Sequence, residues 1–384
     1  MKASLPLIHA PRPSRITSSL AARLSGPSID PSTVEWALDR YGLRGLGGFR
    51  NLRLARRSRN VVVRTDAGTK VVKLYRPQWT EATVRNCHSV LLRLESVGFP
   101  AVRLTRAPEG ATWTRLDGEV LTVFDYLPGR NYSLNYLLRR DRLRLTTIAG
   151  RTLARLHATL NGFVPEGEHH LGFASPDGPP RRDAAWHAAA LDDLVHRTVG
   201  IPDPSARDLA RRLVVGAPQL LDAIHRAGHA VVDAGFPRLV IHGDYGLHNL
   251  LFQPPDVAVP LDFELTRLDL RLNDLISVLG KHRYQGGRYD LESMDTFLRA
   301  YAEGFPLTTD ERRLLPEAWC LYKRQAAVQY WRSYFDTRGP SRKLASALDS
   351  IEQAEWVERH PDVIRRLAHA GGREAAVGNG GRSW

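Results

Sequence analysis

The sequence predicts an α+β protein of two lobes, in which a small, mostly antiparallel sheet precedes a larger and mainly helical part. Three observations support this fold class. The chain has 384 residues, a length that suits two lobes with terminal tails. Residues 45–124 carry mainly strand and hairpin signals, whereas helical periodicity dominates after the Leu-Pro-Gly turn at residues 127–129. We therefore expect residues 31–126 to form the first lobe and residues 127–370 the second.

The two ends of the chain differ in composition from the rest. Residues 1–29 contain no Asp or Glu and are rich in Ser, Pro and Arg. This composition is typical of a disordered basic tail or of an organelle transit peptide, and a start codon placed too early would also produce it. We expect residues 1–30 to form a disordered basic tail, and the Gly-rich residues 371–384 to be disordered as well.

The first lobe is expected to begin with a helix and to continue as a sheet. Ser32 would cap the helix, with Glu35 three residues later as in a capping box. A second helix is expected at residues 81–97, ended by Gly98 with Pro100 just beyond it. Strands, separated by turn residues, are expected at 49–54, 60–65, 69–75, 112–115 and 120–124.

The second lobe is expected to be built from helices around one polar segment. Residues 161–182 are rich in Gly, Pro and His and are expected to form a loop. Helices are expected around 145–156 and at 183–198, 206–233, 290–303, 309–336 and 341–368. Short strands are expected at 239–242, 250–252 and 257–261.

The net charge of +13 results from 54 basic and 41 acidic residues. Such an excess would suit nucleic acid, an anionic surface or an anionic small molecule. Because the arginines are scattered along the whole chain and no nucleic-acid motif occurs, we interpret the charge as a dispersed basic surface and expect no nucleic-acid partner. The same charge argues faintly against a polycationic substrate.

Cysteine usage and hydropathy indicate the cellular compartment that suits this protein. Cys87 and Cys320 are the only cysteines, and they lack the spacing of a metal site or of a disulfide framework. A reducing cytoplasm therefore fits best. The sequence contains no run of about 18 apolar residues, so we expect no membrane-spanning helix. It favours no particular oligomeric state.

The polar segment of the second lobe carries the clearest chemistry. His242 and Asp244 leave one apolar stretch, Asn249 enters the next, and Asp262 ends a third. Polar groups between apolar anchors indicate a rigid loop that holds side chains in a site. Phosphoryl transfer needs a carboxylate to accept a hydroxyl proton and oxygen ligands for Mg²⁺. Asp244 suits the first role, and Asn249 and Asp262 suit the second; taken singly, either carboxylate could instead cap a turn.

This pattern, H-G-D-x-x-x-x-N followed by L-D-F-E, resembles the aminoglycoside phosphotransferase and choline kinase family, relatives of the protein kinases. The resemblance covers residues 45–368 and is most specific at 239–275. It implies a bilobal protein-kinase-like fold and transfer of phosphate from ATP, with Mg²⁺, to a small molecule.

Carried over to this chain, the resemblance assigns a role to each residue of the pattern. Asp244 would be the catalytic base, Asn249 a Mg²⁺ ligand and Asp262 the bridging Mg²⁺ ligand. His242 would order the loop through hydrogen bonds, and Asp274 matches an acidic position that is usually structural.

The first lobe contains a candidate lysine for ATP. Strand alternation places Lys73 on the opposite face from Val72 and Leu74, and a lysine between apolar neighbours needs an anionic partner unless it lies on an exposed edge. It resembles the family's lysine for the α- and β-phosphates. Ser58 lies in the turn where the family's phosphate-covering loop belongs, although the turn lacks a G-x-G-x-x-G pattern.

Residues 124–129 resemble the family's hinge, where the backbone carbonyl of Asp125 and the N–H of Leu127 would bind adenine. One departure concerns the glutamate that normally pairs with the ATP lysine. Cys87 occupies its expected place, and Glu81 and Glu95 lie two turns away on either side. The partner of Lys73 is therefore not assigned from the sequence.

The acceptor is the least determined part of the prediction. Tyr322, Tyr330, Trp331 and Tyr334 form either an aromatic shelf for a substrate or part of the core. The family acts on hydroxyls of antibiotics, amino sugars, sugars, amino acids such as homoserine and amino alcohols, and a fold does not select among them. Two other interpretations are a catalytically idle kinase-like binding or coat protein, and a protein kinase, which the missing H-R-D and A-P-E motifs disfavour.

Overall fold

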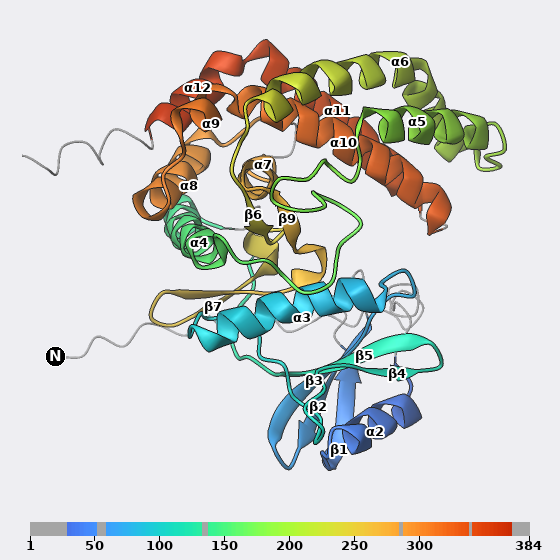
Figure 1. Ribbon diagram of the computed structural model, residues 1–384, viewed down its shortest axis with the longest axis vertical. Coiled ribbons are helices and arrows are strands. Elements are labelled where there is room, and N and C mark those ends of the chain that lie inside the picture. Colours follow the sequence, from blue (N-terminus) through green and yellow to red (C-terminus); the bar gives the residue numbers. More distant parts are fainter. Residues whose placement is uncertain (1–28, 52–58, 133–136, 284–286, 338–339, 371–384) are drawn as a thin grey trace, which may run out of the picture. The chain divides into compact units, whose positions relative to one another are not determined.

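The computed structural model describes residues 29–51, 59–132, 137–283, 287–337 and 340–370 (Figure 1). These residues form two compact units. The first unit reaches to Trp79 and includes Leu104–Tyr126, and the second consists of Thr80–Arg103 and the chain from Leu127 onward. Most of the predicted basic tail, residues 1–30, and all of the predicted C-terminal tail lie outside the described residues.

The first unit is a five-stranded antiparallel sheet with the order β1-β2-β3-β5-β4 and one helix, α2 (Figure 1). Its core is formed by Val34, Ala37 and Leu38 of the helix against strand valines and leucines such as Val63 and Leu121. The elements are α2 (Pro31–Arg40), β1 (Gly45–Asn51), β2 (Arg59–Thr65), β3 (Gly68–Leu74), β4 (Thr114–Leu116) and β5 (Glu119–Asp125). The predicted antiparallel sheet is therefore confirmed, with β1 beginning four residues earlier than expected.

The start of α2 differs from the prediction. Asp30, not Ser32, is the N-cap, and its carboxylate accepts a hydrogen bond from Thr33 N at 3.0 Å. Pro31 takes the first helical position, where its fixed φ and missing N–H cost nothing. Ser32 lies inside the helix and donates its hydroxyl to Asp30 at 2.6 Å.

The second unit is mainly helical, as the sequence predicts. Two short two-stranded antiparallel sheets, β6-β9 and β7-β8, lie among its helices. Its helices are α3 (Glu81–Ser96), α4 (Arg139–Leu160), α5 (Ala184–Thr198), α6 (Pro204–Asp233), α7 (Leu272–Leu279), α8 (Leu291–Gly304), α9 (Thr309–Arg313), α10 (Leu315–Asp336), α11 (Arg342–Arg359) and α12 (Pro361–Ala370). Its strands are β6 (Arg238–Ile241), β7 (Leu250–Gln253), β8 (Val257–Pro260) and β9 (Arg267–Leu270).

Two predicted helices are each divided in two. The helix expected at 309–336 is α9 followed by α10, and the helix expected at 341–368 is α11 followed by α12. In both cases a proline, Pro316 or Pro361, lies in the first turn of the second helix. Proline lacks the N–H that a continuing helix would need, so it starts a new helix instead.

The sequence did not predict α7 or β9. In α7 every residue except Asn273 is buried, so no polar face reveals a helical period. The strand β9 has only four residues and pairs with β6. These two elements matter because they carry residues that support the candidate site.

The helix α3 groups with the second unit, whereas the sequence analysis assigned it to the first lobe. Asn86 of α3 donates its side-chain amide to Thr266 O at 2.8 Å, and Ser89 accepts a hydrogen bond from Glu166 N at 2.9 Å. These long-range bonds tie α3 to the helical unit. Among the described residues, no helix is long and apolar enough to cross a membrane.

Candidate active site

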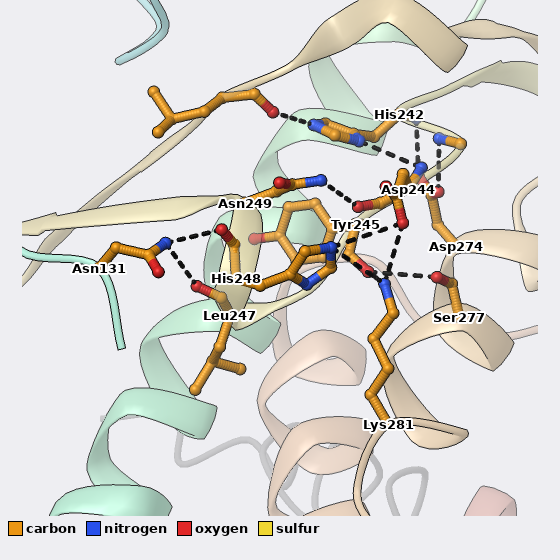
Figure 2. Close-up of polar contacts among 12 residues, drawn as sticks. Asn131, His242, Asp244, Tyr245, Leu247, His248, Asn249, Asp274, Ser277 and Lys281 are labelled. Carbon is orange, nitrogen blue, oxygen red and sulfur yellow. Dashed lines mark hydrogen bonds and ion pairs between the residues drawn. The ribbon is translucent and has the colours of Figure 1, made fainter. Parts of the chain in front are cut away.

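The segment between β6 and β7 is held by one buried carboxylate from α7. Asp274 accepts hydrogen bonds from the backbone N–H groups of His242 at 2.7 Å and Gly243 at 2.8 Å (Figure 2). His157 Nε2 lies 3.1 Å from the same carboxylate. Burial alone would raise the pKa of Asp274, but the bonds to His157 and His242 hold it below its usual value. Burial lowers the pKa of His157, so this ring is neutral and donates from Nε2.

Gly243 is required by the backbone at this point. Its φ is +82°, a conformation that L residues with a side chain rarely adopt. A Cβ at this position would also lie 2.2 Å from Leu265 O and 2.5 Å from Arg267 Nη1. The glycine therefore lets the loop pass close to the start of β9, where Arg267 lies next to Gly243.

His242 links this loop to the segment that contains Asp262. Its Nε2 donates to Leu261 O at 2.8 Å, and its Nδ1 accepts from Asp244 N at 3.3 Å. The ring thus connects the residue before Asp262 with the backbone of Asp244. These bonds suit the loop-ordering role predicted for His242, which remains a prediction.

Asn249 directly precedes β7 and Asp262 lies just after β8, the two paired strands of one hairpin. The side-chain N–H of Asn249 donates to Asp244 O at 2.9 Å, and its backbone carbonyl accepts from Leu261 N at 2.8 Å. The side-chain N–H of Asn249 is used by the bond to Asp244 O, and Asn249 Oδ1 has no hydrogen bond among the described residues. Asp262 has a φ of +60°, a strained conformation that is concentrated at functional sites.

This donor set fits Mg²⁺ better than a transition metal. Carboxylate and amide oxygens are its usual protein ligands, and water and phosphate oxygens complete its coordination. No group of three or more His, Cys, Asp or Glu side chains able to hold a metal occurs in the part of the chain that the structure describes. A Mg²⁺ ion at Asn249 and Asp262 would take its remaining ligands from water and phosphate oxygens.

Asp244 forms an ion pair that the sequence analysis missed. Lys281, two residues after α7, lies with its Nζ 3.0 Å from Asp244 Oδ1 and 3.2 Å from Tyr245 O (Figure 2). His248 Nε2 lies 3.6 Å from the same carboxylate oxygen. Burial lowers the pKa of His248, so the ring is uncharged at neutral pH and Lys281 is the cation of the group. Lys281 lies in no sequence motif, although the scarcity of lysines in this chain could have drawn attention to it.

Asn131 is a further residue that the sequence analysis did not identify. Its side-chain amide lies within hydrogen-bond distance of the carbonyls of Leu247 at 3.2 Å, His248 at 2.7 Å and Leu250 at 3.0 Å (Figure 2). It therefore fixes the second half of the loop, opposite the end that Asp274 holds. No sequence motif marked this asparagine.

In the first unit, Lys73 lies where the strand alternation predicts. The register of β3 places it on the opposite face from Val72 and Leu74, and only 9% of the residue is exposed. Its Nζ lies 5.2 Å from the centre of the Tyr75 ring. Ser58 falls outside the described residues, so its predicted phosphate contact has no structural counterpart here.

The two hinge residues fall in different units. Asp125 ends β5, and its carboxylate accepts a hydrogen bond from Lys70 Nζ at 2.6 Å. Leu127 is the first residue of the second unit after the sheet. Their backbone groups remain a prediction for adenine binding.

Comparison with known proteins shows the family to which this chain is similar. A family model described as "Phosphotransferase enzyme family" matches residues 49–316, more than two thirds of the chain. A homoserine kinase of Phenylobacterium zucineum is 24% identical over 79% of this chain and 86% of its own. A homoserine kinase of Polaromonas naphthalenivorans is 26% identical over 71% and 77%.

Solved structures share the fold. A microcompartment-associated aminopropanol kinase matches with a TM-score of 0.60 and 16% identity, over 88% of this chain and 100% of its own. A spectinomycin phosphotransferase in complex with ADP and spectinomycin matches with a TM-score of 0.56 and 11% identity, over 90% and 99%. These likenesses confirm the predicted kinase-like fold and the resemblance noted in the sequence.

Proposed function

The chain belongs to the phosphotransferase enzyme family and is a small-molecule kinase, and from this premise we propose that it transfers the γ-phosphate of MgATP to a hydroxyl group of its substrate. One observation carries the proposal. The side-chain N–H of Asn249 donates to Asp244 O, which leaves Asn249 Oδ1 for a cation. The Asp244 carboxylate belongs to the same loop. A base and a hard oxygen ligand are thus held by one rigid segment.

Each residue would act without forming a covalent intermediate. Asp244 would accept the proton of the acceptor hydroxyl as the phosphoryl group is transferred. Lys281 would hold the Asp244 carboxylate in place and add positive charge where the phosphoryl group passes. His242 and Asp274 would keep the loop backbone rigid, so the carboxylate does not have to reorganise during the reaction.

The contacts predicted for the nucleotide are retained as proposals. Asn249 and Asp262 would bind Mg²⁺, which, when bound, neutralises charge on the phosphates. Lys73 is proposed to contact the α- and β-phosphates, as the buried ammonium group of β3 suits an anionic partner. Ser58 and the backbone of Asp125 and Leu127 remain proposed contacts for phosphate and adenine.

The acceptor is proposed to be a small alcohol. The named relatives are homoserine kinases, and the structural neighbours include kinases of aminopropanol and ethanolamine and a spectinomycin phosphotransferase. Homoserine, amino alcohols and hydroxyl-bearing antibiotics are therefore the first candidates.

The test is ADP release from MgATP against a panel that holds homoserine, 3-aminopropanol, ethanolamine, choline and spectinomycin. We expect turnover with at least one hydroxyl acceptor, dependence on Mg²⁺, and loss of both in Asp262→Ala. ATP binding without turnover of any hydroxyl compound would contradict the proposal and favour a catalytically idle binding protein. Drug resistance in an expressing host would separate an antibiotic kinase from a metabolic one.

A further inference from the structure

Residues 128–132 lie along the second edge of β7, and we call them the flanking segment. Phe252 N donates to Arg130 O at 2.8 Å, and Arg130 N donates to Phe252 O at 3.0 Å. Gln253 Nε2 donates to Pro128 O at 2.6 Å. These bonds occupy backbone groups of β7 that its partner strand β8 does not use, so the flanking segment acts as a short third strand of this hairpin.

The close approach of the flanking segment to β7 requires glycine at position 129. A Cβ there would lie 2.6 Å from Leu251 Cγ and 3.0 Å from Phe252 O. A larger residue would therefore push the segment away from β7. At the other end of the segment, the rings of Tyr132 and Phe252 pack edge to face, with their centres 5.6 Å apart. These contacts hold Asn131, which lies between them, against the start of β7.

Asn131 places one side-chain amide group among three backbone carbonyls. They are those of Leu247 at 3.2 Å, His248 at 2.7 Å and Leu250 at 3.0 Å (Figure 2). The amide nitrogen carries two hydrogens, so at least one of them is shared between two carbonyls. Leu250 lies opposite Pro260 in the hairpin, and proline has no N–H to offer. Asn131 thus supplies a donor that β8 cannot.

Two of these carbonyls lie on either side of Asn249, the proposed Mg²⁺ ligand. His248 is the residue before it and Leu250 is the residue after it. The backbone N–H, the backbone carbonyl and the side-chain N–H of Asn249 are each hydrogen-bonded as well. Asn131 therefore fixes the peptide groups around the one residue of the loop whose free oxygen faces the proposed cation.

The second proposed ligand is tied to the same stretch. The carbonyl of Asn249 accepts a hydrogen bond from Leu261 N at 2.8 Å, and Leu261 directly precedes Asp262. A shift of the backbone at Asn249 would therefore disturb both proposed ligands. Mg²⁺ demands near-ideal octahedral geometry with metal–oxygen distances of about 2.0–2.1 Å, so it tolerates little displacement of its ligands.

The exposure of Asn131 separates a positioning role from a stabilising one. The residue is exposed to solvent, so water can replace its hydrogen bonds when the amide is removed. The loss of overall stability should then be small. Mobile water does not fix the direction of the carbonyls as a side chain on the flanking segment does, so the main loss would be in the geometry at Asn249.

We propose that Asn131 is a positioning residue for the metal, which holds the backbone around Asn249 so that Asn249 Oδ1 and the Asp262 carboxylate can bind Mg²⁺ together. This inference rests on the proposed function, because it concerns the Mg²⁺ of the same site. Residues that orient metal ligands without touching the metal typically contribute about 10- to 100-fold to metal affinity or activity.

A binding measurement tests this role without turnover. Asn131→Leu removes the amide group and keeps the branched shape of the side chain. Isothermal titration calorimetry gives the Kd of AMP-PNP, a non-hydrolysable ATP analogue, in Mg²⁺ and in EDTA. Mg²⁺ should strengthen binding to the unaltered protein, and in Asn131→Leu this gain should be smaller by about 10-fold or be lost. The Kd in EDTA should change less than about 3-fold, because the metal-free complex does not use Asn249.

Kinetics with an accepted alcohol provide a second readout. In Asn131→Leu the concentration of free Mg²⁺ that gives half of the maximal rate should rise about 10- to 100-fold, and saturating Mg²⁺ should restore most of kcat. The melting temperature without nucleotide should stay within a few degrees of that of the unaltered protein. A kcat that stays low at every Mg²⁺ concentration would show that the loop is merely loosened, and would overturn the positioning role.

The matched control is Gln253→Leu, which removes another side-chain amide that bonds to a backbone carbonyl between β7 and the flanking segment, away from Asn249. It should keep the full gain from Mg²⁺. An equal loss in Gln253→Leu, or an undiminished gain in Asn131→Leu, would overturn the inference and leave the kinase proposal intact. If Mg²⁺ gave no gain even in the unaltered protein, the metal site itself would be refuted, and the proposed function would fall with it.

Discussion

Lys281 Nζ lies 3.0 Å from Asp244 Oδ1, so the carboxylate proposed as the base is one half of an ion pair. The Asp244 side chain is 20% exposed and that of Lys281 is 36% exposed, which leaves the pair open to a ligand. The lysine reaches the carboxylate from the turn that follows α7, where it also bonds to Tyr245 O. The position of the proposed base thus depends on a cation that directly follows α7, a helix that the sequence did not predict.

Lys281→Met should lower kcat by about 10- to 100-fold, because a charge-assisted bond of this kind is worth roughly 1.5–3 kcal/mol. The KM for ATP should change little, since the lysine contacts the loop of Asp244. Steady-state kinetics with the best acceptor of the panel measures both constants. Lys281→Arg keeps the charge and should recover part of the lost kcat. An unchanged kcat in Lys281→Met would show that the ion pair is only structural.

Asp244→Asn should lower kcat by about 100- to 10,000-fold, the usual contribution of a general base. Asparagine keeps the shape of the side chain, and the backbone bonds of the loop do not use the Asp244 carboxylate. The melting temperature should therefore stay within a few degrees of that of the unaltered protein. Full activity in Asp244→Asn would refute the assignment of the base.

The sequence identified the candidate residues of the site, but it did not identify the residues that hold them in place. The motif residues Asp244, Asn249 and Asp262 lie on one short stretch, so their spacing alone suggested a loop and a metal site. Asn131 and Lys281 reach this loop from distant positions and belong to no motif. Contacts between residues so far apart in the sequence depend on tertiary packing, which the periodicity of apolar residues does not predict.

The grouping of Arg182, Arg267 and Arg332 in the second unit also could not be predicted from the sequence. Its members are separated by 85 and 65 positions in the sequence, so the charge was interpreted as scattered. The loop at residues 161–182 was predicted correctly as irregular, yet nothing in its composition showed that Arg182 would meet Arg332. Only the fold, which brings α5 and α10 together, creates the local excess of positive charge.

Asp274→Ala should destabilise the protein by about 3 kcal/mol or more, because it leaves the backbone N–H groups of His242 and Gly243 without an acceptor and the buried His157 without its partner. Urea denaturation followed by circular dichroism measures the change. Asp222→Ala, which removes an exposed carboxylate paired with Arg226, should cost no more than about 0.5 kcal/mol. Similar losses in both variants would contradict the anchoring role of Asp274.

Lys323 of α10 provides a pH-dependent prediction. The residue is 9% exposed, and burial followed by the charge of Lys281 lowers its pKa to about 7. Between pH 7 and 10.5 the unfolded chain holds a proton that the folded chain has lost, so this group makes stability rise with pH across that window. Below pH 7 the full cost of a buried cation is present. Lys323→Met should therefore raise the free energy of unfolding by at least about 1 kcal/mol at pH 6.

The gain in Lys323→Met should shrink as the pH rises from 7 toward 10.5, because the free energy needed to remove the proton from the lysine on folding falls across that window. Urea denaturation at pH 6, 8 and 10 follows it. Arg342→Met, at an exposed position of α11, should show no such trend. A gain independent of pH would mean that Lys323 is not a buried titrating group.

His169 provides a second pH-dependent prediction, at acid pH. The residue is 3% exposed, and burial followed by the charges of Arg267 and His170 lowers its pKa to about 2. The unfolded chain takes up a proton near pH 6.5, whereas the folded chain does not. Stability from this group is therefore present above pH 6.5 and falls by about 1.4 kcal/mol per pH unit as the pH drops below it.

His169→Asn should reduce by about one the number of protons that the chain takes up on unfolding at acid pH. Asparagine can replace the acceptor that His169 Nδ1 offers to Leu171 N at 3.1 Å, because its side chain bonds readily to the N–H two residues on. The free energy of unfolding of the variant should therefore fall less steeply between pH 6 and 4, by about 1.4 kcal/mol per pH unit. His229→Asn changes an exposed histidine of α6 and should keep the slope of the unaltered protein. Equal slopes in all three proteins would mean that His169 is protonated in the folded state, and the arginines around it would then have to be compensated by charge that the described residues do not supply.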